Sequence, residues 1–295
     1  MSISLCMIVK NEEQYIEQAL KSVEGLVDEI IIVDAQSTDQ TVTIAKKYTR
    51  KICSRPWNDD FAEARNFSLQ QATKEWILVL DADEVIAKKD HEQIKALTED
   101  RQYDAYTFIQ ASYTNDLTQF GFTPIQENLP EAKKFLGYIS CNIIRLFRNH
   151  KSMYFSNPVH ESVDDSLKDK TRIKKTDVFI HHYQFEKGAG NQREKQLQYL
   201  KMYEEKKEKF SNKAKLYRDM GIIYANFKQE YEKAISCFKT SLEYNPGNLK
   251  TYAGLLLCYI ATKQKQEAEK LIKICEKRFP AAKEIPQFKQ LISRM

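Results

Sequence analysis

An uninterrupted apolar run that ends in a cluster of carboxylates constrains this chain more than any other feature. Residues 76–80 read Trp-Ile-Leu-Val-Leu, and residues 81–84 read Asp-Ala-Asp-Glu. Five apolar residues in a row are typical of a strand buried on both faces of a parallel sheet. Ligands of open α/β sheets bind at the carboxyl ends of such strands. The acidic residues therefore stand where a ligand site is expected.

Asp81 and Asp83 have the spacing of two side chains on one side of an extended segment, because alternate residues of a strand point the same way. We therefore expect both carboxylates to face one site. Hard oxygen ligands of this kind suit Mg²⁺ or Mn²⁺, usually shared with substrate phosphates. An isolated Asp-x-Asp is also typical of a solvated acidic turn, and the residues alone leave this alternative open.

Composition is that of a globular protein. The 295 residues, 42% of them hydrophobic and 29% charged, suffice for one large domain or two ordinary ones. Six scattered cysteines include no Cys-x-x-Cys pair, which argues against a zinc knuckle and favours a reducing compartment.

No signal peptide or membrane span is evident. We expect a cytoplasmic protein, and the sequence is compatible with a peripheral contact to a membrane.

Charge is distributed unevenly along the chain. Residues 1–190 carry 24 basic and 29 acidic side chains, a net charge of −5, whereas residues 191–295 carry 22 basic and 12 acidic ones, a net charge of +10. An acidic half that gathers a cation and a basic half that docks an anionic partner would explain this. Ordinary solvated lysines on a helical repeat explain it equally well.

The segment 1–80 alternates between strand and helix patterns, which predicts a doubly wound parallel sheet. The expected strands cover residues 4–9, 29–33, 51–54 and 76–80, and the expected helices cover residues 11–23, 38–48 and 61–72. Ser37 to Gln40 fits a capping box at the start of the second helix. Asp34 closes the second strand, where a carboxylate could accept a hydrogen bond from a base or ribose, or form a turn. No Gly-x-Gly-x-x-Gly or Walker A motif is present, which argues against a Rossmann dinucleotide site.

Four segments together resemble family 2 glycosyltransferases of the GT-A fold. They are Cys6 to Glu12, Val33 to Thr41, Trp57 to Asn66 and Leu80 to Glu84, and they follow one another in the family's order. The resemblance implies a Rossmann-like, mostly parallel nucleotide-sugar-binding sheet in residues 1–190. It also implies an enzyme that transfers a sugar from a nucleoside-diphosphate sugar with the help of Mn²⁺ or Mg²⁺.

The resemblance also implies roles for individual residues. The end of the first strand and the residue matching Asp34 hold the nucleotide base, the residue matching Asp81 contacts the ribose, and the residue matching Asp83 ligates the metal. The expected donor-binding residues are Val9, Asn11, Glu12, Asp34, Arg65, Asp81, Ala82 and Asp83. A guanidinium at position 65 could pair with phosphate, or could hold the acidic cluster together structurally.

The middle of the chain supplies a candidate base and a candidate metal ligand. Strands are expected at residues 103–113, 139–147 and 178–183, with an irregular segment at 114–138 suited to acceptor binding. Glu161, in the segment 157–162, is the expected general base, since a related His-Glu pair occurs in similar enzymes. A surface carboxylate beside a turn is the alternative for Glu161.

His182 resembles a histidine that ligates the metal in this fold. The sequence is equally compatible with a histidine that is simply part of the core.

Residues 191–295 read as an all-α domain of tetratricopeptide type. Two sets of positions match that repeat, and the spacing of their final prolines equals its period. The first set is Tyr217, Met220, Gly221, Tyr224, Ala234, Phe238 and Pro246, and the second is Tyr252, Leu255, Leu256, Tyr259, Ala268, Ile272 and Pro280. The first set carries one extra residue between Tyr224 and Ala234. Two repeats need packing partners at their ends, and the first domain, a second copy of the chain or a bound protein could supply them.

These observations predict an inverting, metal-dependent glycosyltransferase that moves one sugar, with UDP as the favoured nucleotide. The acceptor would be a hydroxyl or thiol on a glycan, a lipid-linked glycan or a protein, and the repeats make a peptide acceptor credible. No nucleic-acid partner is expected, and a homodimer is compatible with the sequence. A non-catalytic adaptor with a degenerate first domain is the alternative. A nucleotidyltransferase would need a Gly-rich basic loop after the first strand, and residues 10–13 match this poorly.

Overall fold

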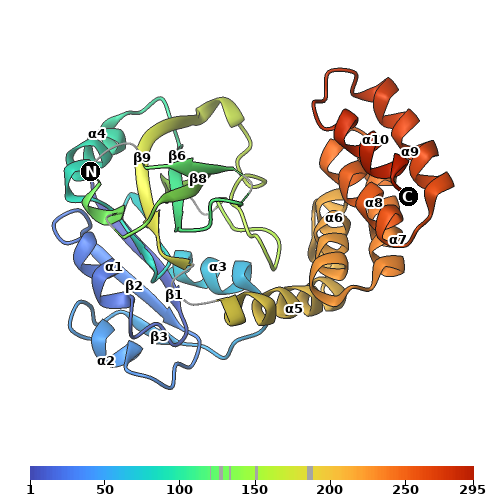
Figure 1. Ribbon diagram of the computed structural model, residues 1–295. Helices are drawn as coiled ribbons and strands as arrows, with labels where there is room; N and C mark the ends of the chain where they lie inside the picture. The colour runs from blue at the N-terminus through green and yellow to red at the C-terminus, as the bar shows by residue number, and fades with distance from the viewer. Residues whose placement is uncertain (120, 126–128, 133, 150–151, 185–188) are drawn as a thin grey trace. The chain divides into compact units, whose positions relative to one another are not determined.

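The computed structural model describes residues 1–119, 121–125, 129–132, 134–149, 152–184 and 189–295. The chain divides into two compact units, Met1–Ala189 and Gly190–Met295. All strands of the described chain belong to the first unit, in a single sheet, and the second unit is helical (Figure 1). The fold therefore changes from α/β to all-α at the boundary between the units.

The segment 1–80 forms the parallel half of the sheet. Its elements are β1 (Ile3–Val9), α1 (Ile16–Ser22), β2 (Glu29–Asp34), α2 (Thr41–Ala45), β3 (Ile52–Ser54), α3 (Phe61–Gln71) and β4 (Trp76–Val79). The strands lie in the order β3-β2-β1-β4, and every neighbouring pair is parallel. The predicted strands and helices are present, although α1 and α2 are shorter than expected.

The second half of the sheet has mixed pairing. Its elements are β5 (Glu84–Val85), α4 (His91–Glu99), β6 (Ala105–Thr114), β7 (Phe122–Pro124), β8 (Gly137–Arg148) and β9 (Ile173–His182). The strand β8 is antiparallel to both β4 and β6, whereas β9 is parallel to β6 and antiparallel to β5. The segment 114–138, predicted to be irregular, contains the short strand β7, which pairs with β8.

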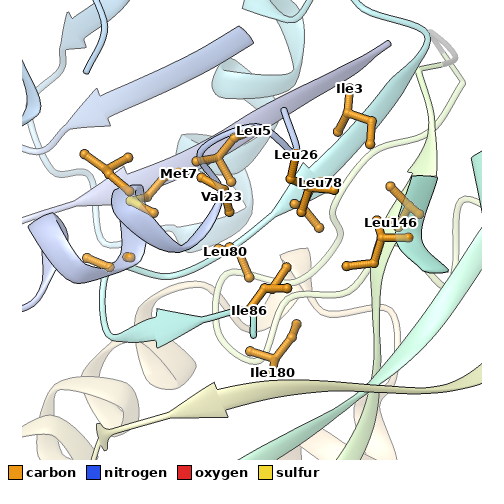
Figure 2. Packing of buried hydrophobic residues seen from close by; sticks show 14 of the residues in the cluster. Ile3, Leu5, Met7, Val23, Leu26, Leu78, Leu80, Ile86, Leu146 and Ile180 are labelled. Atoms are coloured by element: carbon orange, nitrogen blue, oxygen red, sulfur yellow. The ribbon is translucent and has the colours of Figure 1, made fainter. Parts of the chain in front are cut away.

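Helices cover both faces of the sheet, as a doubly wound fold requires. Alternate residues of β1 divide between the two faces: Leu5 packs in the same cluster as Leu20 of α1, and Cys6 packs in the same cluster as Leu69 of α3. Figure 2 shows the first of these clusters, with side chains of β1 and β4 beside Leu26. Because both faces are covered, a ligand can reach the parallel strands only at their ends.

The prediction of a capping box at residues 37–40 is wrong. The helix α2 begins at Thr41, and its N-cap residue Gln40 makes no side-chain capping bond. The hydroxyl of Ser37 instead accepts a hydrogen bond from the backbone N–H of Asn11 at 2.9 Å. A contact with a distant segment of the chain has replaced the local cap, because the loops after β1 and β2 lie next to each other.

The second unit consists of helices and a π-helical turn. They are α5 (Ala189–Glu205), α6 (Lys213–Ile223), the π turn (Tyr224–Lys228), α7 (Tyr231–Tyr244), α8 (Leu249–Ala261), α9 (Lys265–Arg278) and α10 (Ile285–Ser293). Most residues of the predicted repeat pattern, such as Phe238 and Tyr252, are buried and form the core of this unit. In the part of the chain that the structure describes, no helix combines the length and apolar character needed to cross a bilayer.

The π turn accommodates the extra residue of the first repeat. Ten positions separate Tyr224 from Ala234, whereas nine separate the matching Tyr259 and Ala268. A π turn takes up one additional residue within a helix. Gln229 then ends the turn with a left-handed backbone, at a φ of 58°. The insertion therefore remains local, and Tyr224 and Ala234 are both still buried in the core.

Glu29, at the start of β2, is a buried carboxylate with several hydrogen-bond partners. Its side chain is 6% exposed. It accepts hydrogen bonds from the Ser4 hydroxyl at 2.5 Å, from the backbone and hydroxyl of Thr73 at 2.8 Å, and from Lys51. Burial alone would raise the pKa of Glu29, but these hydrogen bonds outweigh it and lower the pKa from 4.5 to about 2. The carboxylate form therefore stabilises the folded state.

Glu29→Gln should lower the free energy of unfolding by about 1–3 kcal/mol at neutral pH. Because the folded pKa is depressed, the contribution of Glu29 is complete above about pH 4.5 and is lost as the pH falls toward 2. Both tryptophans, Trp57 and Trp76, belong to the first unit, so urea unfolding followed by tryptophan fluorescence reports this unit alone. A difference between wild type and variant that does not shrink over this pH range would contradict the assignment.

Candidate active site

The carboxyl ends of β1, β2 and β4 meet at one edge of the sheet, because these strands are parallel neighbours. Val9 at the end of β1 pairs with Asp34 at the end of β2, and the acidic segment follows β4. Three loop residues at this edge have left-handed backbones: Asn11 (φ 55°), Gln36 (φ 60°) and Asp59 (φ 48°). Such conformations persist where the surroundings hold them, and they cluster at ligand sites.

Hydrogen bonds tie the loops after β1 and β2 together. The side-chain oxygen of Asn11 accepts a bond from the backbone N–H of Thr38 at 2.8 Å. The backbone N–H of Glu12 donates to the hydroxyl of Thr41 at 2.7 Å, and the N–H of Ala35 donates to the carbonyl of Val9 at 2.8 Å. The predicted donor-binding residues of the first strand are thus held beside the end of the second.

Asp34 is 4% exposed and accepts hydrogen bonds from the backbone N–H of Ser37 at 3.1 and 3.3 Å. The turn-forming role that the sequence left open is therefore present. A carboxylate has about four acceptor positions, so this role is compatible with a second bond to a nucleotide base.

The segment from Asp81 to Glu84 is a tight turn, so the expectation of extended geometry at Asp81 and Asp83 is wrong. The backbone N–H of Glu84 donates to the carbonyl of Asp81 at 3.0 Å, and the N–H of Asp81 donates to the carboxylate of Glu84 at 2.8 Å. The turn is not solvated either, because Ala82 and Asp83 are both buried. As a result, Asp81 and Asp83 make separate sets of contacts.

Arg65 of α3 bridges two of the predicted site residues. Its Nε donates to Oε1 of Glu161 and its Nη2 donates to Oδ1 of Asp81, both at 2.6 Å. The guanidinium also lies over the ring of Phe155, 5.5 Å from its centroid. These contacts agree with the structural alternative for Arg65, in which it holds the acidic cluster together.

A strained loop delivers Glu161 to Arg65. Asn157 and His160 have left-handed backbones, with φ of 70° and 52°. The carbonyl of Pro158, between them, accepts a hydrogen bond from the backbone N–H of Phe61 at the start of α3 at 2.9 Å. The side chain of Glu161 is 12% exposed. It therefore does not match the alternative of a free surface carboxylate.

Arg145 of β8 is a site residue that the sequence interpretation missed. Its Nη2 donates to Glu84 at 2.7 Å and to Oδ2 of Asp81 at 3.3 Å. Gln110 of β6 donates a further hydrogen bond to the fully buried Glu84. A single arginine among apolar strand residues was the available signal, because arginine is almost never fully buried without a partner.

Asp81 lies at the centre of this ion network. Burial would raise its pKa, but the guanidinium groups of Arg65 and Arg145 outweigh burial and hold the pKa of Asp81 well below its usual range. The side chain of Asp81 is 30% exposed, whereas those of the two arginines are 7% and 4% exposed. Asp81 is therefore more open to a ligand than the two arginines, and it is an ionised acceptor at neutral pH.

Asp83 faces His182, the other residue expected to ligate a metal. His182 Nε2 lies 3.6 Å from Oδ1 of Asp83. The pairing of β5 with β9 places Glu84 opposite His182 and thereby brings the preceding Asp83 to the imidazole. Burial would lower the pKa of His182, but the carboxylate of Asp83 outweighs burial and raises it.

The neighbouring His181 belongs to a different environment. Its Nδ1 is 2.6 Å from the hydroxyl of Tyr113, and its ring stacks on that of Tyr113 with centroids 5.8 Å apart. Burial lowers the pKa of His181 to about 4. The side chain is therefore a neutral core residue at pH 7, whereas His182 faces the carboxylate of Asp83.

The pair of Asp83 and His182 fits a divalent cation that is shared with a substrate. Among the described residues, no group of three or more His, Cys, Asp or Glu side chains is arranged to hold a metal. Two protein ligands completed by substrate phosphates and water are usual for Mg²⁺ sites. Neighbouring ligands on one octahedral ion, with bonds of about 2.1 Å, lie about 3 Å apart, close to the observed 3.6 Å. An imidazole ligand favours Mn²⁺ over Mg²⁺.

Arg145→Met should destabilise the first unit by about 3–5 kcal/mol, because it leaves the buried carboxylate of Glu84 without its charge partner. Glu84→Gln in the same chain should recover much of this loss, since the buried carboxylate is then gone as well. Urea unfolding followed by tryptophan fluorescence measures both variants. Equal stabilities of the single and double variants would show that the Arg145–Glu84 pair is not a buried ion pair.

Family models match both parts of the chain. The model described as glycosyl transferase family 2 matches residues 4–160, and the model described as tetratricopeptide repeat matches residues 228–292. A TPR repeat-containing protein of Synechococcus elongatus is 36% identical over 165 residues, which are 56% of this chain and 36% of that protein. An uncharacterised glycosyltransferase of Rickettsia felis is 31% identical over 56% of this chain and 54% of its own length. The chain thus spans about half or less of these curated relatives.

A solved structure shares the fold. The crystal structure of S. aureus TarS 1–349 in complex with UDP-GlcNAc aligns over 92% of this chain and 89% of that chain, with a TM-score of 0.51 and 14% sequence identity. At this identity the likeness concerns the fold alone. It agrees with the predicted architecture of an α/β sheet followed by helices.

Proposed function

The chain belongs to glycosyl transferase family 2, and from this premise we propose that it transfers one sugar from a nucleoside-diphosphate sugar to an acceptor, with inversion at the anomeric carbon. The observation that carries the proposal is the pairing of Asp83 with His182 beside the Asp81 network, at the carboxyl ends of the parallel strands. A single transfer is favoured because the Gln-x-x-Arg-Trp motif of processive members is absent from the sequence.

The donor would bind along the edge formed by β1, β2 and β4. Asp34 would accept a hydrogen bond from the base, with Val9, Asn11 and Glu12 shaping that end of the site. Asp81, the exposed and ionised member of the ion network, would accept hydrogen bonds from the ribose. Arg65 would act by holding Asp81 in place, and the buried Ala82 would anchor the turn between Asp81 and Glu84. UDP is the favoured nucleotide, and the bound UDP-GlcNAc of S. aureus TarS makes UDP-sugars the first donors to test.

Asp83 and His182 would hold the diphosphate through a divalent cation. When bound there, Mn²⁺ or Mg²⁺ neutralises charge that develops on the departing diphosphate. The two side chains themselves contribute position. His182 is held by the pairing of β9 with β5 and β6, and the carbonyl of Asp83 accepts a hydrogen bond from the backbone N–H of Tyr183, so the diphosphate would be oriented before the reaction begins.

Glu161 is the proposed general base. The acceptor hydroxyl or thiol would give its proton to Glu161 while its oxygen or sulfur forms the bond to the anomeric carbon. On the opposite face of the sugar, the bond between the anomeric carbon and the diphosphate oxygen breaks, and the nucleoside diphosphate leaves with the electron pair. Arg65 contacts Oε1 of Glu161, so Oε2 is the oxygen that would take the proton.

The acceptor would be a glycan, a lipid-linked glycan or a protein. The tetratricopeptide match at residues 228–292 supports a peptide or protein acceptor that the repeats recruit. A peripheral membrane contact would suit a lipid-linked acceptor. A second copy of the chain could cover the end of the short repeat array, which needs a packing partner.

A screen of nucleotide sugars tests the proposal. We expect slow hydrolysis of one UDP-sugar with Mn²⁺ in the absence of acceptor, and none after chelation of the metal. UDP with Mn²⁺ should also raise the melting temperature, because a ligand that binds only the native state stabilises it. If neither hydrolysis nor a shift occurs with any nucleotide, the enzyme proposal fails, and the alternative of a non-catalytic adaptor becomes the better account.

A further inference from the structure

A hydroxyl group contacts the imidazole of His182 at the ring nitrogen that does not face Asp83. Oγ of Ser112 lies 3.0 Å from Nδ1 of His182, while Nε2 of His182 is the atom 3.6 Å from Asp83. Ser112 is 7% exposed and His182 is 9% exposed, so water does not compete freely at this contact. The two ring nitrogens of His182 therefore have different partners, supplied by different strands.

Strand pairing fixes this arrangement. β9 lies between β6 and β5, and His182 is the direct partner of Ser112 on β6 and of Glu84 on β5. Side chains of residues directly opposite each other in a sheet project to the same face. The hydroxyl and the Asp83 turn consequently approach the imidazole from its two sides.

The chemistry of imidazole determines which way the hydrogen bond must run. A neutral imidazole has one N–H and one lone pair, and a metal can bind only at the nitrogen that carries the lone pair. If the cation binds Nε2, the proton resides on Nδ1 and needs an acceptor. A serine hydroxyl oxygen is such an acceptor, whereas a methyl group at the same place is not.

We propose that Ser112 is a positioning residue for the cation: it accepts the Nδ1–H of His182 and so presents the Nε2 lone pair beside Asp83. This inference rests on the metal role assigned to Asp83 and His182 in the proposed function. Partners of this kind, which hold the second nitrogen of a metal-binding histidine, typically change metal affinity by about 10–100-fold when they are removed.

A matched pair of substitutions tests the role of the hydroxyl. Ser112→Val and Ser112→Thr add nearly the same volume to a β-strand position, and only threonine keeps a hydroxyl. We expect the dissociation constant for Mn²⁺, measured by titration calorimetry of the full chain with UDP present, to rise about 10–100-fold in Ser112→Val. It should stay within about threefold of wild type in Ser112→Thr. Ser112→Ala removes the hydroxyl without adding atoms and should behave like Ser112→Val.

Two outcomes would overturn the inference, and they can be told apart. If the wild type binds Mn²⁺ with UDP but all three variants bind it equally well, Ser112 does not position His182, and the proposed metal pair still stands. If the wild type itself binds no Mn²⁺, the metal role of Asp83 and His182 fails together with that of Ser112. The melting temperature of Ser112→Thr without metal should stay close to that of the wild type, which would show that the added methyl group does not disturb the sheet.

Discussion

Asp83→Ala is expected to reduce sugar transfer by at least about a thousandfold, because the diphosphate would lose the carboxylate that holds its cation. The fold should survive this substitution, since the buried guanidinium groups of Arg65 and Arg145 pair with Asp81, whereas Asp83 faces His182. Initial rates with saturating donor and Mn²⁺, together with the melting temperature, measure the two effects separately.

Glu92→Ala is a suitable control for this substitution. Glu92 lies on α4 of the same unit, its side chain is 85% exposed, and its ion pair is with Lys95 on the same helix. Such surface pairs contribute little to stability, so the control variant should transfer sugar at the wild-type rate. Near-normal turnover of Asp83→Ala, with the control unchanged, would refute the metal role of Asp83.

Glu161→Gln should lower kcat by about 10²–10⁴ while leaving donor affinity within a few fold, because the amide cannot take the acceptor proton. Glutamine keeps a side-chain oxygen at the position of Oε1, so the hydrogen bond from Arg65 Nε can persist. Donor binding is measured by calorimetry with UDP and Mn²⁺, and kcat is measured with saturating donor and acceptor.

Asp81→Asn provides the comparison that Glu161→Gln needs. Both substitutions remove a charge that faces Arg65, so any effect due to a disturbed Arg65 should appear in both variants. As the proposed ribose contact, Asp81→Asn should chiefly raise KM for the donor, whereas Glu161→Gln should chiefly lower kcat. If the two variants show the same pattern, Glu161 acts only as a partner of Arg65 and another base must be found.

Much of the fold could be predicted from local patterns. The uninterrupted apolar run before Asp81 is a strand because it is buried on both faces, and helices alternate with such strands through residue 80. The family assignment from four short motifs is confirmed by the match at residues 4–160. The extra residue of the first repeat was visible in the sequence, although its form as a π turn was not.

Predictions from local sequence patterns were wrong where a residue forms its hydrogen bond with a partner that the pattern did not include. Ser37 was expected to cap its own helix, but it accepts the N–H of Asn11 from the neighbouring loop. The extended geometry expected for Asp81 and Asp83 gives way to a turn that the buried side chain of Glu84 closes. In both places the observed geometry depends on a hydrogen bond that the local pattern did not predict.

The sequence by itself determined the α/β and helical parts of this protein and its family, because hydrophobic periodicity and short motifs are properties of neighbouring residues. Only the tertiary structure decided how those residues are partnered. Arg65 and Glu161 are 96 positions apart, Arg145 and Glu84 are 61 apart, and Ser112 and His182 are 70 apart. A buried charge or imidazole takes its pKa and orientation from whichever group the fold brings within hydrogen-bonding distance, and no local pattern encodes that choice.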